Sequence, residues 1–127
     1  MIKLLLVALG GAAGSSARYL FGVQATRLFG AGWPYGTLGV NVLGGLAMGV
    51  LTGWLAQRGG VDQERWRVLL GVGVLGGFTT FSAFSLESAL MMERRDYGAA
   101  FAYIALSVGL SIAALFAGLM LSRRVFA

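Results

Sequence analysis

Four long apolar stretches follow one another along the chain, separated by short polar segments. They cover about residues 2–28, 35–57, 68–92 and 97–121. A membrane-spanning helix needs roughly 20 apolar residues, so each stretch is long enough to cross a bilayer. The pattern predicts an all-α membrane protein with four transmembrane helices, which form a single transmembrane domain over residues 1–127.

The third stretch contains an unusual mixture of glycines, hydroxyl residues and phenylalanines between Gly71 and Ser88. Polar groups at membrane depth are costly and usually mark a pathway. The paired glycines Gly76 and Gly77 allow a helix to break where its backbone lines a cavity. We therefore expect the third helix to break near its middle, between Gly76 and Thr80. Such a break exposes carbonyls, which coordinate small cations, or N–H groups, which favour anions.

On a continuous third helix, hydroxyls and phenyl rings would form two parallel rows. The spacing of three gives Thr79, Ser82, Ser85 and Ser88 for the hydroxyls, and Phe78, Phe81 and Phe84 for the rings. The edge of a phenyl ring is electropositive. Ring edges and hydroxyls can therefore solvate a small anion, weakly enough for it to leave again. Simple packing against lipid or another helix is the alternative on spacing alone.

Polar side chains also interrupt the other three stretches. Asn41, in the second, provides either an interhelical hydrogen bond or a ligand contact. Tyr103, Ser107 and Ser111, in the fourth, are four residues apart and place three hydroxyls on one helix face. Arg18 lies past the middle of the first stretch. It either reaches an interface or an acidic partner, or lines a water-filled vestibule and attracts anions.

The glycines indicate where the helices are expected to pack closely against one another. The chain has 21 glycines and one proline, and transmembrane helices tolerate glycine because it lets backbones approach closely. Gly10 and Gly14 form one pair at helix-contact spacing, and Gly45, Gly49 and Gly53 form a flat face on the second helix. Both sets predict close helix–helix contacts.

Composition removes several classes of function. Charged residues make up 12% of the chain, against about 25% in ordinary soluble domains. Histidine and cysteine are absent, which excludes disulfides, His-dependent catalysis and the common His or Cys metal sites. The serines have neither a histidine nor a lysine within a span as a base, so we expect no enzyme activity. The net charge of +5 lies on residues that flank the spans, so we expect no nucleic-acid partner.

The flanking cations give a modest orientation bias. The side with both termini carries six of them and the other side three: Lys3, Arg58, Arg65, Arg67, Arg123 and Arg124 against Arg27, Arg94 and Arg95. This bias favours the termini inside. The start, MIKLLLVAL, is also typical of a signal peptide, but the sequence after it stays helix-compatible, so we expect it to be retained as the first span.

Three signatures together resemble those of the bacterial Fluc fluoride channels, over nearly the whole chain. They are GGxxG-xxx-R at residues 10–18, GTLxxNxxG at 36–44 and GxxGGxTTFSxFS at 73–85. The resemblance implies an antiparallel, dual-topology homodimer with two fluoride pores in the bacterial inner membrane. Dual topology agrees with the modest bias of the flanking cations, because each copy must be able to insert either way.

The resemblance also implies the site residues. The fluoride pore would be formed by Asn41, Phe81, Ser82, Phe84, Tyr103, Ser107 and Ser111. Arg18 would be the vestibule arginine, and the backbone carbonyls of Gly76 and Thr79 would hold a structural sodium ion at the dimer centre. The chain departs from the family pattern FSTFS, because Ala83 has no hydroxyl. A pore role for that position is therefore not carried over.

These observations predict a fluoride-selective channel that exports cytoplasmic fluoride down its electrochemical gradient. The alternative is a small four-helix, proton-coupled exporter of cationic compounds. That function needs a carboxylate deep in a span, and Glu87 is the one candidate. A scaffold subunit without transport is a third hypothesis, and it leaves the polar rows unexplained.

Overall fold

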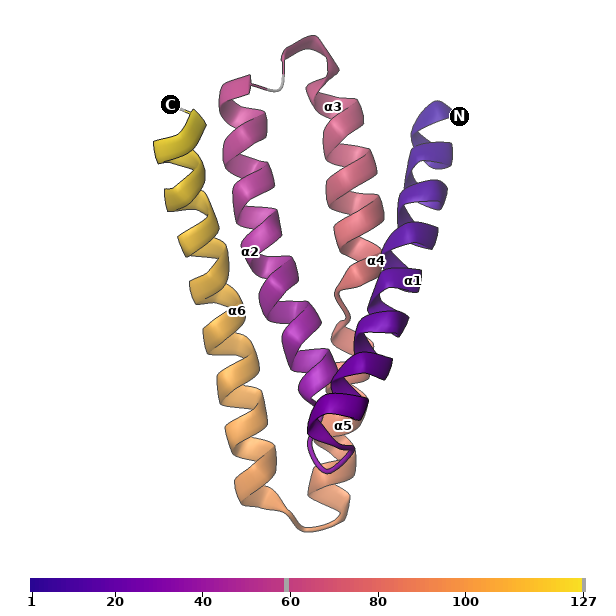
Figure 1. The fold of residues 1–127 in the computed structure, drawn as a ribbon, viewed down its shortest axis with the longest axis vertical. Coiled ribbons are helices and arrows are strands. Elements are labelled where there is room, and N and C mark those ends of the chain that lie inside the picture. Colours follow the sequence, from indigo (N-terminus) through magenta and orange to yellow (C-terminus); the bar gives the residue numbers. More distant parts are fainter. Residues whose placement is uncertain (59, 127) are drawn as a thin grey trace.

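The computed structural model describes residues 1–58 and 60–126 and is helical throughout, with short connections (Figure 1). Three long helices are α1 (Ile2–Phe29), α2 (Tyr35–Arg58) and α6 (Tyr97–Phe126). Between α2 and α6 lie five shorter pieces: the 3-10 turn η1 (Gly60–Asp62), α3 (Gln63–Trp66), the π-helix η2 (Arg67–Leu75), α4 (Gly76–Phe78) and α5 (Phe81–Glu93). The four runs α1, α2, η1 to α5, and α6 are each long and apolar enough to cross a membrane, which confirms the four predicted spans.

Two of the spans extend beyond their predicted ends. The third helical run begins before its predicted start at residue 68, in a charged segment where Arg67 Nη2 forms an ion pair with Glu64 Oε1 at 2.5 Å. These residues are three apart, a spacing at which side chains stabilise a helix. α6 continues to Phe126 and includes Arg123 and Arg124. Cations are favourable in the last turn of a helix, so the helix need not end before them.

The helices form a bundle with both termini at one end (Figure 1). η1 lies at the same end, and the turn between α5 and α6 lies at the other. The most extensive contacts join α2 to α6 and α1 to η2. The third span therefore packs against the first, and the fourth against the second.

Glycine faces bring these helix pairs together, as predicted. A Cβ on Gly49 would lie 2.9 Å from the backbone nitrogen of Leu119 on α6. A Cβ on Gly14 would lie 2.9 Å from the backbone nitrogen of Phe78 on α4. Real Cβ contacts are essentially never shorter than 3.0 Å. The backbones of these helices therefore lie too close together for any larger residue at Gly14 or Gly49 without a shift.

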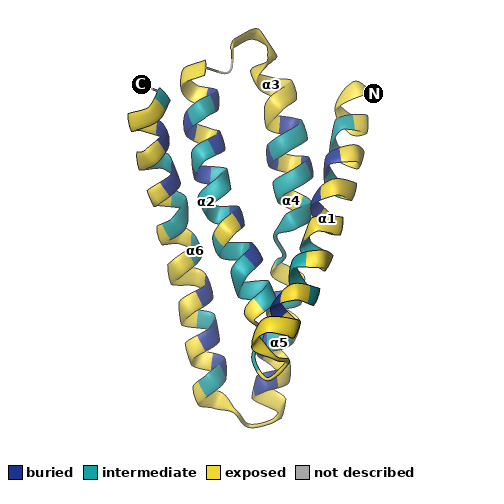
Figure 2. Cartoon of the chain, in the orientation of Figure 1, coloured by how far each residue is buried: buried dark blue, intermediate teal, exposed yellow. Residues whose placement is uncertain are grey.

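Many large apolar side chains are exposed. Figure 2 shows exposed residues along all the long helices. Leu9, Phe101 and Phe116 are examples of exposed ones. The buried apolar cluster is small and consists of Phe84, Met91, Ala100 and Tyr103, between α5 and α6. This inversion suits a bilayer, because lipid tails solvate apolar side chains and the driving force between helices is close packing.

The third span breaks at Thr79 and Thr80, within the predicted interval but not at the paired glycines. Thr79 (φ −90°, ψ 162°) and Thr80 (φ −153°, ψ 124°) are extended, whereas Gly76 is helical (φ −61°, ψ −38°). The glycines serve close packing instead, since a Cβ on Gly77 would lie 2.7 Å from the carbonyl oxygen of Gly11. Because of this break, Thr79 is not in one continuous row with Ser82, as an uninterrupted helix would require.

Candidate functional site

The break takes several carbonyls out of the helical hydrogen-bond ladder, those of Gly76 and Thr79 among them. In an α-helix each N–H donates to the carbonyl four residues earlier. The Thr80 N–H, which would donate to Gly76, donates instead to Asn41 Oδ1 (2.8 Å). The Ala83 N–H, which would donate to Thr79, donates instead to Thr80 Oγ1 (3.1 Å) and caps α5. The carbonyls of Gly76 and Thr79 are therefore left without their helical donors.

These two carbonyls are the ones predicted to hold a cation, and their chemistry fits one. Hard cations prefer oxygen ligands, and backbone carbonyls are among them. Over residues 1–58 and 60–126, no group of three or more acidic side chains could hold a metal ion. A cation site at the break would accordingly be built from the backbone.

Asn41 holds the break in place from α2. Its Oδ1 accepts from the Thr80 N–H, and its Nδ2 donates to the Thr80 carbonyl (3.0 Å). Both ends of the amide thus pair with one residue of the extended segment. Of the two sequence interpretations of Asn41, the structure supports an interhelical hydrogen bond, and the same side chain also lines a cavity.

Five of the seven predicted pore residues line this cavity of about 400 Å³, the pore cavity: Asn41, Phe81, Phe84, Ser107 and Ser111. Tyr103 lies behind Phe84, with ring centroids 5.3 Å apart. Ser82 is exposed and does not line the cavity, although its Oγ lies 3.3 Å from Thr80 Oγ1. The structure therefore brings together residues of α2, α5 and α6 around one space, next to the break.

The two phenylalanines of this cavity differ in burial. Their ring centroids lie 5.5 Å apart at an interplanar angle of 52°. Phe84 is 8% exposed, whereas Phe81 is 77% exposed. Phe84 thus forms part of the α5–α6 core, and Phe81 projects from the surface of the single chain at the cavity.

Three of the hydroxyl groups on α6 are buried and have no hydrogen-bond partner among the described residues. They are Tyr103 Oη, Ser107 Oγ and Ser111 Oγ. Other buried serines are paired, since Ser88 donates to the Phe84 carbonyl (2.8 Å) and Ser122 to the Val50 carbonyl (3.0 Å). Burying an unpaired hydroxyl is costly, so three in one line indicate a polar ligand that is not part of the chain.

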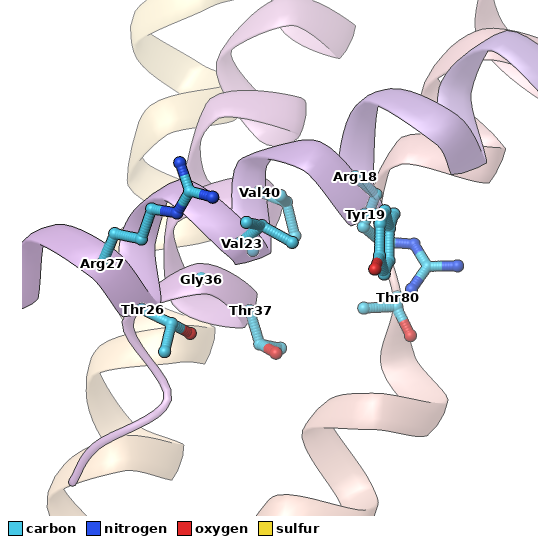
Figure 3. A pocket seen from close by; sticks show the side chains of 10 residues that line it. Arg18, Tyr19, Val23, Thr26, Arg27, Gly36, Thr37, Val40 and Thr80 are labelled. Carbon is cyan, nitrogen blue, oxygen red and sulfur yellow. The ribbon is translucent and has the colours of Figure 1, made fainter. Parts of the chain in front are cut away.

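Arg18 lines a second cavity of about 520 Å³, the vestibule cavity, together with Tyr19, Arg27 and Thr37 (Figure 3). Thr80 lines both cavities, so the two spaces meet at the break. Arg18 forms no ion pair with an acid of residues 1–58 or 60–126. Its Nε donates to the Gly77 carbonyl (3.1 Å). The acidic partner considered for Arg18 is therefore not found.

Two threonines belong to this region and were not among the predicted site residues. Thr80 caps α5 and lines both cavities. A hydroxyl residue directly before an apolar helix is the usual signal for such a cap. Thr37 Oγ1 donates to Glu87 Oε1 (2.5 Å) and joins α2 to α5. Thr37 lies one helical turn before Asn41, and this spacing is the only feature of the sequence that points to Thr37 as a site residue. Glu87 is thus a hydrogen-bonded side chain of the bundle.

Comparison with known proteins gives the same family as the three sequence signatures, over nearly the whole length of the chain. The family model described as "CrcB-like protein, Camphor Resistance (CrcB)" matches residues 5–119. A Caulobacter sp. (strain K31) protein named "Fluoride-specific ion channel FluC" is 70% identical, over 99% of this chain and 98% of the relative. Proteins of the same name from Phenylobacterium zucineum and Hyphomonas neptunium are 69% and 52% identical, over 100% and 97% of both chains.

Proposed function

Because this chain belongs to the CrcB-like family, we propose that it is a fluoride-specific ion channel and not an enzyme. It exports cytoplasmic fluoride down its electrochemical gradient. The observation that carries this proposal is the line of three buried hydroxyls, Tyr103, Ser107 and Ser111, which have no protein partner in the described chain. A small anion that accepts hydrogen bonds would satisfy them.

Fluoride reaches the hydroxyls through the vestibule cavity. Arg18 and Arg27 give this cavity a positive charge that concentrates anions. The route passes Thr80 and enters the pore cavity, where Phe81 and Phe84 lie next to the hydroxyls of α6. Among residues 1–58 and 60–126, none that lines the pore cavity is charged, so an anion is held by dipoles and ring edges and can leave again.

A sodium ion is the proposed structural partner of the break. The carbonyls of Gly76 and Thr79 would hold it, because both have lost their helical donors to Asn41 and Thr80. When bound, the ion would supply a positive charge to which these two carbonyl oxygens are attracted. The chain's own contribution is the pair of side-chain hydrogen bonds that keep the carbonyls free.

The working unit is proposed to be an antiparallel homodimer of dual topology with two pores, in the bacterial inner membrane. Phe81 is 77% exposed beside the pore cavity in a single chain, so a second copy has a large apolar ring to cover. The cations of the loops and ends are biased only modestly to one side, which allows both orientations of insertion.

The decisive experiment is fluoride efflux from liposomes that contain the purified protein, measured with a fluoride electrode. We expect rapid release of fluoride, almost no release of chloride, and unchanged release after a protonophore collapses any proton gradient. Fluoride release equal to that of empty liposomes would refute the proposal. Organic-cation transport that requires a proton gradient and is lost in Glu87→Gln would instead establish the exporter function.

A further inference from the structure

The carbonyl of Gly77 lies between the two carbonyls proposed to face the cation, and it has a partner from another helix. In an uninterrupted helix it would accept from the Phe81 N–H, but Thr79 and Thr80 are extended between them. Arg18 Nε donates to it instead (3.1 Å), from α1. The close approach of Gly14 to the backbone nitrogen of Phe78 holds α1 next to this point.

Asn41 and Arg18 therefore bind the break from two different helices. Asn41, on α2, pairs with both backbone groups of Thr80. Arg18, on α1, pairs with Gly77, on the other side of Thr79. Figure 3 shows the guanidinium of Arg18 next to Thr80 and the extended segment, and well apart from Arg27. The extended residues thus lie between two anchor points that different helices provide.

We propose that Arg18 is a positioning residue for the break, and that it acts through its Nε–H and not through its charge. Arg18 occupies the Gly77 carbonyl and leaves the carbonyls of Gly76, Phe78 and Thr79 as the oxygens of this segment that lack a helical donor. The terminal nitrogens of the same guanidinium keep the vestibule positive. This inference rests on the proposed function only for its transport consequence, because the hydrogen bond orders the break whether or not an ion passes.

The chemistry of side chains allows the two roles of Arg18 to be separated. In Arg18→Gln, the amide nitrogen is bonded to Cδ, as Nε is in arginine, so a neutral N–H donor stays at the same point of the side chain. Arg18→Met has a similar length and no donor. Arg18→Lys keeps the charge but has a methylene at the Nε position. Arg27→Gln removes one charge from the same cavity at a residue on the far side from the break.

The test is hydrogen–deuterium exchange of the peptide that spans residues 79–85 in the purified, assembled protein, alongside fluoride efflux from liposomes. In Arg18→Met and Arg18→Lys we expect this peptide to exchange about two- to tenfold faster, the factor given by a typical hydrogen bond that does not depend on charge. Arg18→Gln and Arg27→Gln keep the wild-type exchange rate of this peptide. Each removes one positive charge from the vestibule cavity, so both lose the same share of fluoride efflux, and this loss is largest at low ionic strength.

Efflux also requires a tenfold or higher sodium concentration for half-maximal activity in Arg18→Met, and a nearly wild-type concentration in Arg18→Gln. The proposal is overturned if Arg18→Gln exchanges as fast as Arg18→Met, or if Arg18→Lys is protected and Arg18→Gln is not. If Arg18→Met does not fold, the exchange rate of Arg18→Gln compared with that of Arg18→Lys still shows whether the donor or the charge orders the break. A wild-type protein without fluoride efflux would refute the proposed function, and the exchange measurement would still decide the role of Arg18.

Discussion

The side-chain amide of Asn41 pairs with both backbone groups of Thr80, accepting from its N–H at 2.8 Å and donating to its carbonyl at 3.0 Å. A side-chain amide carries an acceptor oxygen and a donor nitrogen on one carbon, so it can pair with the N–H and the carbonyl of one residue together. The interruption of the third span is therefore stabilised by the second span.

Replacing Asn41 with Asp should lower both fluoride efflux and the stability of the protein. A carboxylate can accept from the Thr80 N–H but repels the Thr80 carbonyl, which is left unpaired. We expect fluoride efflux to fall at least about tenfold and the protein to lose about 1–3 kcal/mol of stability, the cost of an unpaired buried group. Thr52→Ala, on the exposed side of α2, is the matched control. Wild-type efflux and melting temperature in Asn41→Asp would contradict the double pairing.

Phe81→Ile and Phe84→Ile should both impair fluoride transport, but for different stability costs. Phe84 is 8% exposed and packs against Tyr103, so its replacement should cost about 1–2 kcal/mol, below the 3–5 kcal/mol of Phe→Ala. Phe81 is 77% exposed in the chain, so its replacement should lower the melting temperature less than that of Phe84. Both variants should keep the elution volume of the assembled protein. Wild-type efflux in both would refute a role for the ring edges.

Ser107→Ala and Ser122→Ala should have opposite effects. Ser107 Oγ is buried without a protein partner, so its removal should keep or raise the melting temperature while fluoride efflux falls. Ser122 Oγ donates to the Val50 carbonyl, so its removal should cost about 1 kcal/mol while efflux is unchanged. Melting curves and electrode traces on the two variants decide the matter. A loss of stability in Ser107→Ala would mean that its hydroxyl is paired within the protein.

Gly49→Ala should be destabilising although alanine is the better helix former. Its Cβ would lie 2.9 Å from Leu119 N and 3.0 Å from the Leu115 carbonyl carbon, which are backbone atoms that cannot yield locally. We expect a loss of about 1–3 kcal/mol, the usual cost of overpacking. The control is Gly109→Ala, where a Cβ meets no atom within 4 Å and stability should hold or rise. Equal melting temperatures for both variants would show that α2 and α6 can separate without cost.

The sequence predicts the spans well and the break less well, for a physical reason. Span length is a local property that follows from the thickness of the bilayer. Glycine spacing is also local, and it follows from the close packing of helices within the bilayer. A glycine pair, by contrast, serves either flexibility or close packing, and only the proximity of Gly77 to Gly11 shows that packing applies here. The interruption instead begins at Thr79, whose extended backbone depends on partners in other helices.

The site was predictable where the pattern is local and not where it depends on distant contacts. The spacing of Tyr103, Ser107 and Ser111 by four places their hydroxyls on one face from sequence alone. The hydrogen bond from Arg18 to Gly77 joins residues 59 positions apart, and the bond from Thr37 to Glu87 joins residues 50 apart. No spacing rule connects such pairs, because their proximity is set by the packing of α1 and α2 against the third span.

Both ends of the chain lie at the same end of the bundle, and this has a consequence for duplicated genes. If two copies were joined end to end by a short polar linker, the second would begin on the side where the first finished. It would then insert in the same orientation, which is the wrong one for an antiparallel pair. A single-chain version of the proposed antiparallel dimer would need a connecting segment that itself crosses the membrane once.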